Sequence, residues 1–141
     1  MTGVLASQQI AALYESGAIT SDLPLVEGQI QPASLDLRLG HEAIRVRASF
    51  LAGAGRRLSD RIAEFEMHRV DLRQGAVLEK GCVYVVPLLE RLDLPAGLTA
   101  VANAKSSTGR LDLLTRTITD GGTEFDRVAE GYRGPLYAEI C

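Results

Sequence analysis

Leu35-Asp36-Leu37-Arg38-Leu39-Gly40-His41-Glu42-Ala43-Ile44-Arg45-Val46-Arg47 is the stretch that decides the fold class. In residues 35–39 leucines alternate with charged side chains, and in residues 44–47 aliphatic residues alternate with arginines. A period of two places the apolar side chains on one face of a strand, so each half predicts a half-buried strand. Gly40-His41 predicts the turn between them.

The rest of the chain repeats this pattern of short strands and turns. More strands are expected between glycine and proline turns, at residues 76–78, 82–88, 98–102 and 136–140. The charged and irregular residues 50–71 predict an excursion from the core, with a helical turn near residues 60–66. Several short strands at close spacing predict a mainly β fold, either a sandwich or a barrel.

Two short helices are expected among the strands. Ser7–Ser16 has a helical apolar face, with Ser7 as the expected N-cap and Gly17 as the expected end. The second helix is predicted over residues 106–115, with a serine cap and inward-facing leucines at positions 111, 113 and 114.

Composition narrows the class of protein. At 141 residues, 46% hydrophobic and a net charge of −3, the chain fits a single domain without the basic excess that polymeric nucleic acid requires. No signal peptide or membrane span is expected. Two distant cysteines, Cys82 and Cys141, and two histidines, His41 and His68, predict no zinc cluster and fit a reducing cytoplasm. The chain ends inside its last predicted strand, so we expect the domain to be truncated at residue 141.

The run Lys105-Ser106-Ser107-Thr108-Gly109-Arg110 groups a cation, three hydroxyls and an arginine at the expected start of the second helix. A helix N-terminus offers free N–H groups and a positive dipole end, which favour an anion such as phosphate. An ordinary capped helix whose Arg110 pairs with a surface acid fits the same residues. Spacing alone leaves both interpretations open.

Glu139 is a lone carboxylate in the apolar strand predicted at residues 136–140. The period of two places it between Tyr137 and Cys141 on one face of that strand. A carboxylate removed from water suits a general base or a proton shuttle. A solvent-facing glutamate on an edge strand is the alternative, and the strand pattern alone does not decide between them.

Three runs in order resemble the signatures of dCTP deaminases. Residues 30–40 (IQPASLDLRLG) resemble their early signature, and residues 89–95 followed by 105–111 (LERLDLP, KSSTGRL) resemble their central one. Residues 131–139 (GYRGPLYAE) resemble their catalytic strand. Each run is weak alone, but the ordered set is specific, and it is most similar to the long bacterial form with a second related domain.

This resemblance implies a fold and an activity. The fold is the distorted β-barrel or jelly-roll of the dUTPase-like type with short helices, assembled as a homotrimer or through the second related domain. The activity is hydrolysis of dCTP to dUTP and ammonia, with Mg²⁺ on the triphosphate and no zinc. Zinc deaminases carry an H-x-E…P-C-x-x-C signature, which this chain lacks.

The resemblance also assigns roles to residues. Glu139 matches the catalytic glutamate, which takes a proton from water and returns it to the departing ammonia. Ser106 and Arg110 match residues that order the attacking water and the cytosine. Substrate-binding roles fall on Lys105 and Ser107 for the phosphates and on Tyr132 of the catalytic strand.

One departure bears on the product. Ala129 stands three residues before Tyr132, where the dUTPase relatives place an aspartate that touches the deoxyribose and helps to position water at the α-phosphate. Asp126 lies out of register after an apparent insertion around Thr119–Glu124. We therefore expect dUTP rather than dUMP as the product. A dUTP pyrophosphatase, a bifunctional enzyme and an inactive nucleotide-binding module are the alternatives.

Overall fold

The computed structural model describes residues 3–104 and 113–141. Most of its regular structure is β-strand, as predicted, with two short helices. The elements are α1 (Ser7–Ser16), β1 (Ile19–Ser21), β2 (Glu42–Val46), α2 (Leu58–Phe65), β3 (Glu66–Asp71), β4 (Val83–Asp93), β5 (Ala100–Val101), β6 (Thr115–Thr119), β7 (Arg127–Val128) and β8 (Arg133–Ile140).

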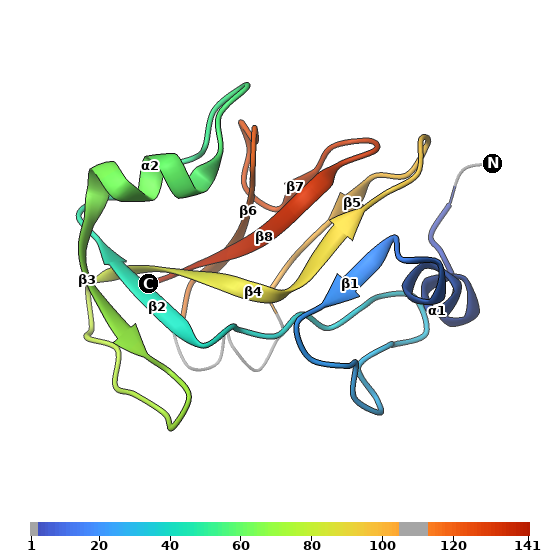
Figure 1. Cartoon of the computed structure of the whole chain (residues 1–141), viewed down its shortest axis with the longest axis horizontal. Helices are drawn as coiled ribbons and strands as arrows, with labels where there is room; N and C mark the ends of the chain where they lie inside the picture. The colour runs from blue at the N-terminus through green and yellow to red at the C-terminus, as the bar shows by residue number, and fades with distance from the viewer. Residues whose placement is uncertain (1–2, 105–112) are drawn as a thin grey trace.

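The strands form one large and one small antiparallel sheet. The large sheet has the order β3-β2-β4-β8-β6, and β1 pairs with the far end of β4. The small sheet consists of β5 and β7. Figure 1 shows α1 beside β1 at one end of the molecule and α2 above β3 at the other. β8, which carries Glu139, therefore lies between β4 and the edge strand β6 of the large sheet.

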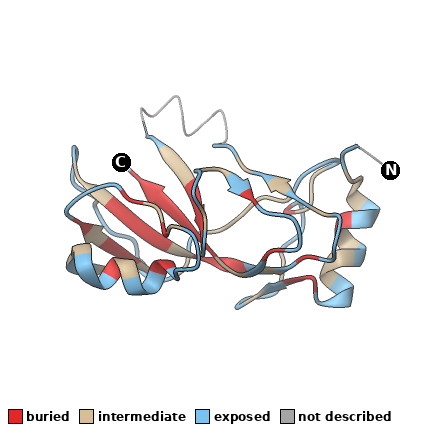
Figure 2. Cartoon of the chain, turned by 90° about the horizontal axis from the view of Figure 1, so that it is seen from above, coloured by how far each residue is buried: buried red, intermediate tan, exposed pale blue. Residues whose placement is uncertain are grey.

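Alternate residues of the central strands fill two separate cores. Leu136, Ala138 and Ile140 of β8 belong to one hydrophobic cluster, which also holds Tyr84 and Tyr132. Tyr137 of the same strand belongs to the other cluster, which packs α2 against the sheet. Figure 2 shows the buried residues concentrated on these strands, whereas the helices keep exposed outer sides. The alternation predicted for residues 136–140 is therefore confirmed.

The run that predicted the first strand does not form a regular strand. Residues 35–39 make only isolated bridges, Ile30 with Leu35 and Leu39 with Leu88. The physical reason is Glu90, whose carboxylate takes the hydrogen bond that a strand partner would otherwise receive. The Arg38 backbone N–H donates to Glu90 Oε1 at 2.7 Å, and Arg38 Nε donates to Oε2 at 2.8 Å.

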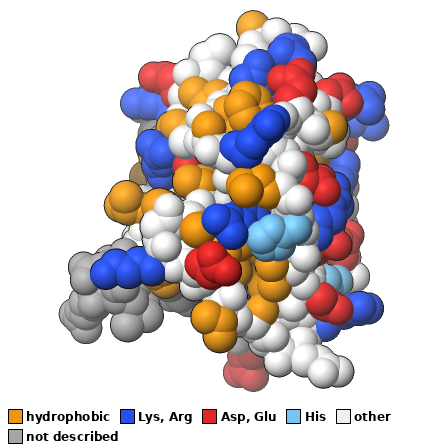
Figure 3. Space-filling view, turned by 90° about the vertical axis from the view of Figure 1, so that its left-hand side faces the viewer, with side chains coloured by type: hydrophobic (Ala, Val, Ile, Leu, Met, Phe, Trp, Pro, Cys, Tyr) orange, Lys and Arg blue, Asp and Glu red, His pale blue; other side chains and the backbone are white. Residues whose placement is uncertain are grey.

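Two further strand predictions are corrected. Residues 76–78 lie in the loop between β3 and β4, where Val77 is 89% exposed and no strand pairs with it. β3 lies within residues 50–71, which were expected to be irregular. Arg69 of this strand pairs with Glu42 and Glu66, and charges of this kind are usual on an edge strand. Figure 3 shows this end of the molecule, where basic and acidic side chains are interspersed with apolar ones.

The helix predictions hold in part. α1 has the predicted bounds and ends at Gly17, whose positive φ of 88° suits glycine. Its N-cap is Ala6 rather than Ser7, and the Ala6 N–H donates to the Gln9 side chain. In the helix predicted over residues 106–115, positions 106–112 lie outside the described residues. Leu113 and Leu114 are exposed and not helical, and Thr115 already belongs to β6, because it pairs with Ile140.

Candidate active site

Glu139 is buried near the end of β8, with only 4% of its side chain exposed. Strand alternation turns it toward the cluster that contains Tyr137, Ile118 and the residues of α2. Its neighbour across the sheet on β6 is Arg116, and on β4 it is Val85. The solvent-facing alternative is therefore excluded, and within residues 3–104 and 113–141 the carboxylate has a single cation beside it.

Arg116 is that cation. Its Nη2 lies 3.2 Å from both carboxylate oxygens of Glu139, and the same nitrogen donates to Ser49 Oγ at 3.1 Å. The guanidinium also stacks over the Phe125 ring, 3.8 Å from its centroid. The Arg116 side chain is 43% exposed. Arg116 thus lies between the buried carboxylate of Glu139 and the solvent.

Sequence reasoning missed Arg116, Ser49 and Phe125. Residues 115–119 read Thr-Arg-Thr-Ile-Thr, a β-branched alternation typical of a strand, and this pattern would have placed Arg116 on one face with Ile118. What the pattern lacks is the register. Only the pairing of β6 with β8 brings Arg116 opposite Glu139.

Of the other predicted site residues, the structure describes Tyr132. It is buried in the cluster opposite to the face of Glu139. Its hydroxyl accepts from the Asp120 N–H at 3.0 Å and donates to the Pro135 carbonyl at 2.6 Å. Burial is the main cause that raises the pKa of Tyr132 to about 12. The roles assigned to Lys105, Ser106, Ser107 and Arg110 fall on residues outside the described part of the chain and stay predictions.

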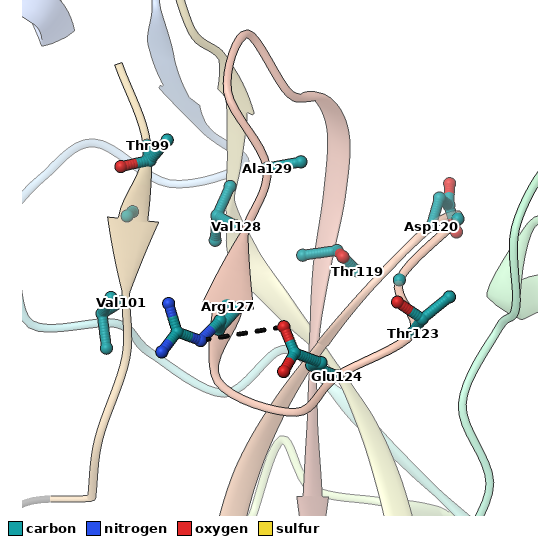
Figure 4. A pocket seen from close by; sticks show the side chains of 12 residues that line it. Thr99, Val101, Thr119, Asp120, Thr123, Glu124, Arg127, Val128 and Ala129 are labelled. Atoms are coloured by element: carbon teal, nitrogen blue, oxygen red, sulfur yellow. Dashed lines mark ion pairs between the residues drawn. The ribbon is translucent and has the colours of Figure 1, made fainter. Parts of the chain in front are cut away.

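A pocket of about 310 Å³ opens between the small sheet and the loop that follows β6. Figure 4 shows Thr99 and Val101 on one side, Thr119 and Asp120 on the other, and Arg127 near Glu124 at the bottom. Arg127 and Glu124 form a loose ion pair, with 3.8 Å between Nε and Oε2. The volume is at the lower end of the range for small-molecule sites.

Ala129 lines this pocket, so the position of the missing aspartate faces the cavity. Asp126 does not line it. Its Oδ1 accepts from the Thr117 N–H at 2.7 Å, and its own N–H donates to the Thr117 carbonyl at 2.9 Å. The carboxylate of Asp126 is therefore engaged with the backbone of β6.

The described residues offer no obvious metal centre. In residues 3–104 and 113–141, no three side chains among His, Cys, Asp and Glu gather closely enough to hold an ion. Cys82 and Cys141 are both free thiols. Neither described helix has the length and apolar character needed to span a bilayer.

Comparisons with known proteins agree with the sequence signatures. Residues 1–141 match the family described as 2'-deoxycytidine 5'-triphosphate deaminase (DCD) N-terminal domain. The crystal structure of 2'-deoxycytidine 5'-triphosphate deaminase from Agrobacterium tumefaciens superposes with a TM-score of 0.95 at 57% identity, covering 99% of this chain and 41% of that one.

Curated relatives carry the same name. The dCTP deaminase of Halorubrum lacusprofundi is 28% identical over 91% of this chain and 61% of its own length. That of Haloarcula marismortui is 29% identical over 97% of this chain and 68% of its own length. The chain thus spans between 41% and 68% of these proteins. It belongs to the family of dCTP deaminase N-terminal domains.

Proposed function

We propose that the protein carrying this chain hydrolyses dCTP to dUTP and ammonia, with Glu139 as the proton shuttle. The observation that carries the proposal is the burial of Glu139 on β8 beside a cation that reaches solvent. A buried carboxylate whose described partner is a partly exposed arginine suits proton transfer better than one enclosed by several donors.

The reaction proceeds in balanced steps. The carboxylate of Glu139 takes one proton from a water molecule, and the hydroxide attacks C4 of the cytosine ring. The protonated carboxyl then delivers that proton to the amino group as the C4–N bond breaks. Ammonia leaves with this proton, and Glu139 returns to its carboxylate form. The second proton of the water, still on O4, moves to N3, and the ring becomes uracil.

Arg116 has a supporting role in this proposal. Its Nη2 contacts both oxygens of Glu139 and so orients the carboxylate. Stacking on Phe125 holds the guanidinium in place while its outer side stays in water. Ser106 and Arg110 are proposed to order the attacking water and the cytosine, as the family resemblance implies.

The other end of the nucleotide is assigned by the same resemblance. Lys105 and Ser107 are proposed to bind the phosphates. Tyr132 is proposed to support the part of the site that holds the nucleoside. Because the hydroxyl of Tyr132 already has two partners, its support acts through its ring and through the Asp120 backbone. The deoxyribose is proposed to lie in the pocket that Ala129 lines.

Mg²⁺ is proposed to arrive with the triphosphate and to be coordinated by phosphate oxygens, which are hard ligands of the kind it prefers. No zinc is proposed. A cytoplasmic homotrimer, or an equivalent assembly built with a second related domain, is the proposed form of the enzyme, and dCTP is its partner rather than polymeric nucleic acid or a membrane.

We propose dUTP as the released product. Attack on the α-phosphate needs a group that orients water near the sugar, and Ala129 cannot do so. Asp126 is held by the backbone of β6, which supports the same conclusion. A pyrophosphatase or a bifunctional enzyme would need another carboxylate in that position.

The test is to incubate the full-length protein with dCTP and Mg²⁺ in H₂¹⁸O and to measure ammonia, pyrophosphate and the labelled product together. We expect ammonia and dUTP in equal amounts, ¹⁸O at O4 of uracil, and no pyrophosphate. Activity should vanish with EDTA and return with Mg²⁺, and a zinc-selective chelator should have no effect. Equal yields of ammonia and pyrophosphate would indicate a bifunctional enzyme. Binding without ammonia would indicate an inactive module.

A further inference from the structure

Two stretches that the proposed function leaves unexplained meet in the structure. One is residues 53–58, which we call the brace segment, within the excursion after β2. The other is residues 119–124, the pocket loop, which is the apparent insertion after β6. The pocket loop forms one wall of the cavity that Ala129 lines. The contact between the two joins parts of the chain more than sixty positions apart.

Three hydrogen bonds join the brace segment to the pocket loop. The Gly53 N–H donates to the Gly122 carbonyl at 2.9 Å, and the Gly121 N–H donates to the Arg56 carbonyl at 2.7 Å. The Leu58 N–H, at the first residue of α2, donates to Asp120 Oδ1 at 2.8 Å. A carboxylate here also complements the positive end of the helix. These three hydrogen bonds hold the pocket loop at Asp120, Gly121 and Gly122.

The brace segment is itself firmly anchored. Leu58 is fully buried, and Ala52 just before the segment is 1% exposed. Both belong to the cluster that contains Tyr137 and Ile118. The loop is therefore tied through the brace segment to the face of the sheet on which Glu139 lies.

Asp120 is the residue that completes this arrangement. Its side chain accepts from Leu58, and its backbone N–H donates to the hydroxyl of Tyr132. It thus connects α2, the pocket loop and the tyrosine before β8. Figure 4 places it at the edge of the pocket, across from Val101 and Arg127.

The turn of the pocket loop leaves no room for a side chain at Gly122. A Cβ on Gly122 would lie 2.7 Å from Thr119 Oγ1 and 3.1 Å from the Thr119 carbonyl, so the turn is closed tightly. A loop of this kind holds one shape only while its backbone partners stay in place.

We infer that Asp120 is a positioning residue, which through the brace segment holds the pocket loop in the shape that binds the nucleoside. The inference rests on the proposed function for its ligand. It assigns a role to the excursion after β2: this stretch is a support built behind the nucleotide pocket. Asp120 contributes through its acceptor oxygen and its backbone, so its charge is expected to matter less than its shape.

The test uses the full-length protein with Glu139→Gln as background, so that dCTP binds without turnover. Asp120→Ala should raise the Kd for dCTP about tenfold, because it leaves the buried Leu58 N–H without a partner and frees the loop. Asp120→Asn keeps an acceptor and should stay within about threefold. Ile62→Ala is the matched control: it weakens the packing of α2 without touching the pocket loop, and should lower Tm but leave Kd unchanged.

Amide hydrogen exchange provides a readout that needs no ligand. Peptides covering residues 53–58 and 119–124 should lose protection in Asp120→Ala, but peptides covering 119–124 should keep it in Ile62→Ala. Unchanged exchange in Asp120→Ala would overturn the inference, whether or not the background protein binds dCTP. A background protein that binds no dCTP would refute the proposed function, which is a separate result. Equal weakening of binding by Ile62→Ala, or unchanged binding with a loosened loop, would also overturn the inference. Should Asp120→Ala fail to fold, Gly122→Ala must weaken dCTP binding, and unchanged binding would reject the inference.

Discussion

Glu90 on β4 and Glu139 on β8 are two buried carboxylates on neighbouring strands that are held in different ways. Glu90 is fully buried and receives hydrogen bonds from the Arg38 backbone, the Arg38 Nε and the Gln29 side chain, between 2.7 and 2.9 Å. Among the residues that the structure describes, Glu139 receives only the Nη2 of Arg116, at 3.2 Å from each oxygen.

The arginines that pair with the two glutamates are also held differently. The Arg38 guanidinium also binds Ser21 Oγ and the carbonyls of Leu23 and Pro24, so it is fixed in a network that ties the early part of the chain to β4. Arg116 is 43% exposed and has one further polar partner in the described part of the chain, Ser49. Burial alone therefore does not identify a catalytic acid. Glu90, which is enclosed by three donors, is interpreted as a structural carboxylate, whereas Glu139, beside a partly exposed arginine, is the candidate for proton transfer.

The largest effect is expected from Glu139→Gln, which should lower kcat for ammonia release by about a hundredfold to ten-thousandfold. The amide keeps the shape of the side chain but cannot accept a proton from water. Glu90→Gln is the matched control, with the same substitution on the neighbouring strand. Its kcat per folded molecule should stay within a few-fold of the wild type. Steady-state assays of both variants check this, and loss of activity in the control would break the comparison.

The free energy of unfolding should fall more in Glu90→Gln than in Glu139→Gln, which is the opposite of the order expected for kcat. Glu90→Gln should lower the free energy of unfolding by about 3 kcal/mol, because it leaves the partly buried Arg38 guanidinium without its counter-charge. Glu139→Gln should cost about 1 kcal/mol or less, since its partner can turn to water. Urea denaturation of the two variants measures both values. A larger loss in Glu139→Gln would mean that Glu139 is the structural acid.

The role of Arg116 sharpens the comparison. Arg116→Met should lower kcat roughly tenfold, because the carboxylate loses the charge and the hydrogen bonds that orient it. Arg116→Lys keeps the charge but not the planar group that stacks on Phe125, and its loss should be smaller. Initial rates at saturating dCTP decide between them. A faster Arg116→Met enzyme would instead identify Arg116 as a residue that blocks Glu139.

The smallest effect is expected at Tyr132, whose hydroxyl resembles Glu90 in having its partners supplied by the protein. Burial raises its pKa to about 12, above the unfolded value of about 10. The neutral hydroxyl therefore contributes fully below pH 10, and this contribution is lost as the pH rises toward 12. Tyr132→Phe should cost about 1 kcal/mol at pH 8 and lose less stability between pH 10 and 12. Urea denaturation at pH 8 and pH 11 measures the free energy of unfolding of the wild type and of Tyr132→Phe. An equal loss in the two proteins between these pH values would contradict the prediction.

The sequence predicts those parts of the fold that local patterns determine. The period of two identified β2 and β8 and placed Glu139 on the correct strand, and the glycine and proline turns located the core of β4. β3 was missed because most of its side chains are exposed and only Val70 packs against a core cluster, so no alternation marks it. The ion pair between Arg38 and Glu90 joins residues 52 positions apart, and no local sequence pattern predicts it.

The candidate site divides in the same way. The glutamate could be found from its strand, but its partner Arg116 depends on the register between β6 and β8. The pocket loop and the brace segment depend on contacts between two distant excursions. The four residues assigned from the central signature, Lys105, Ser106, Ser107 and Arg110, lie outside the described residues and rest on the family resemblance.

The most direct test of the account is a single-turnover measurement on the full-length protein. Wild type and Glu139→Gln are each saturated with dCTP and Mg²⁺, binding is verified, and the ammonia released from the bound nucleotide is followed over time. We expect the wild type to convert its bound dCTP completely, while the Glu139→Gln complex keeps its dCTP intact over the same interval. Release of ammonia from the Glu139→Gln complex at the wild-type rate would contradict the account.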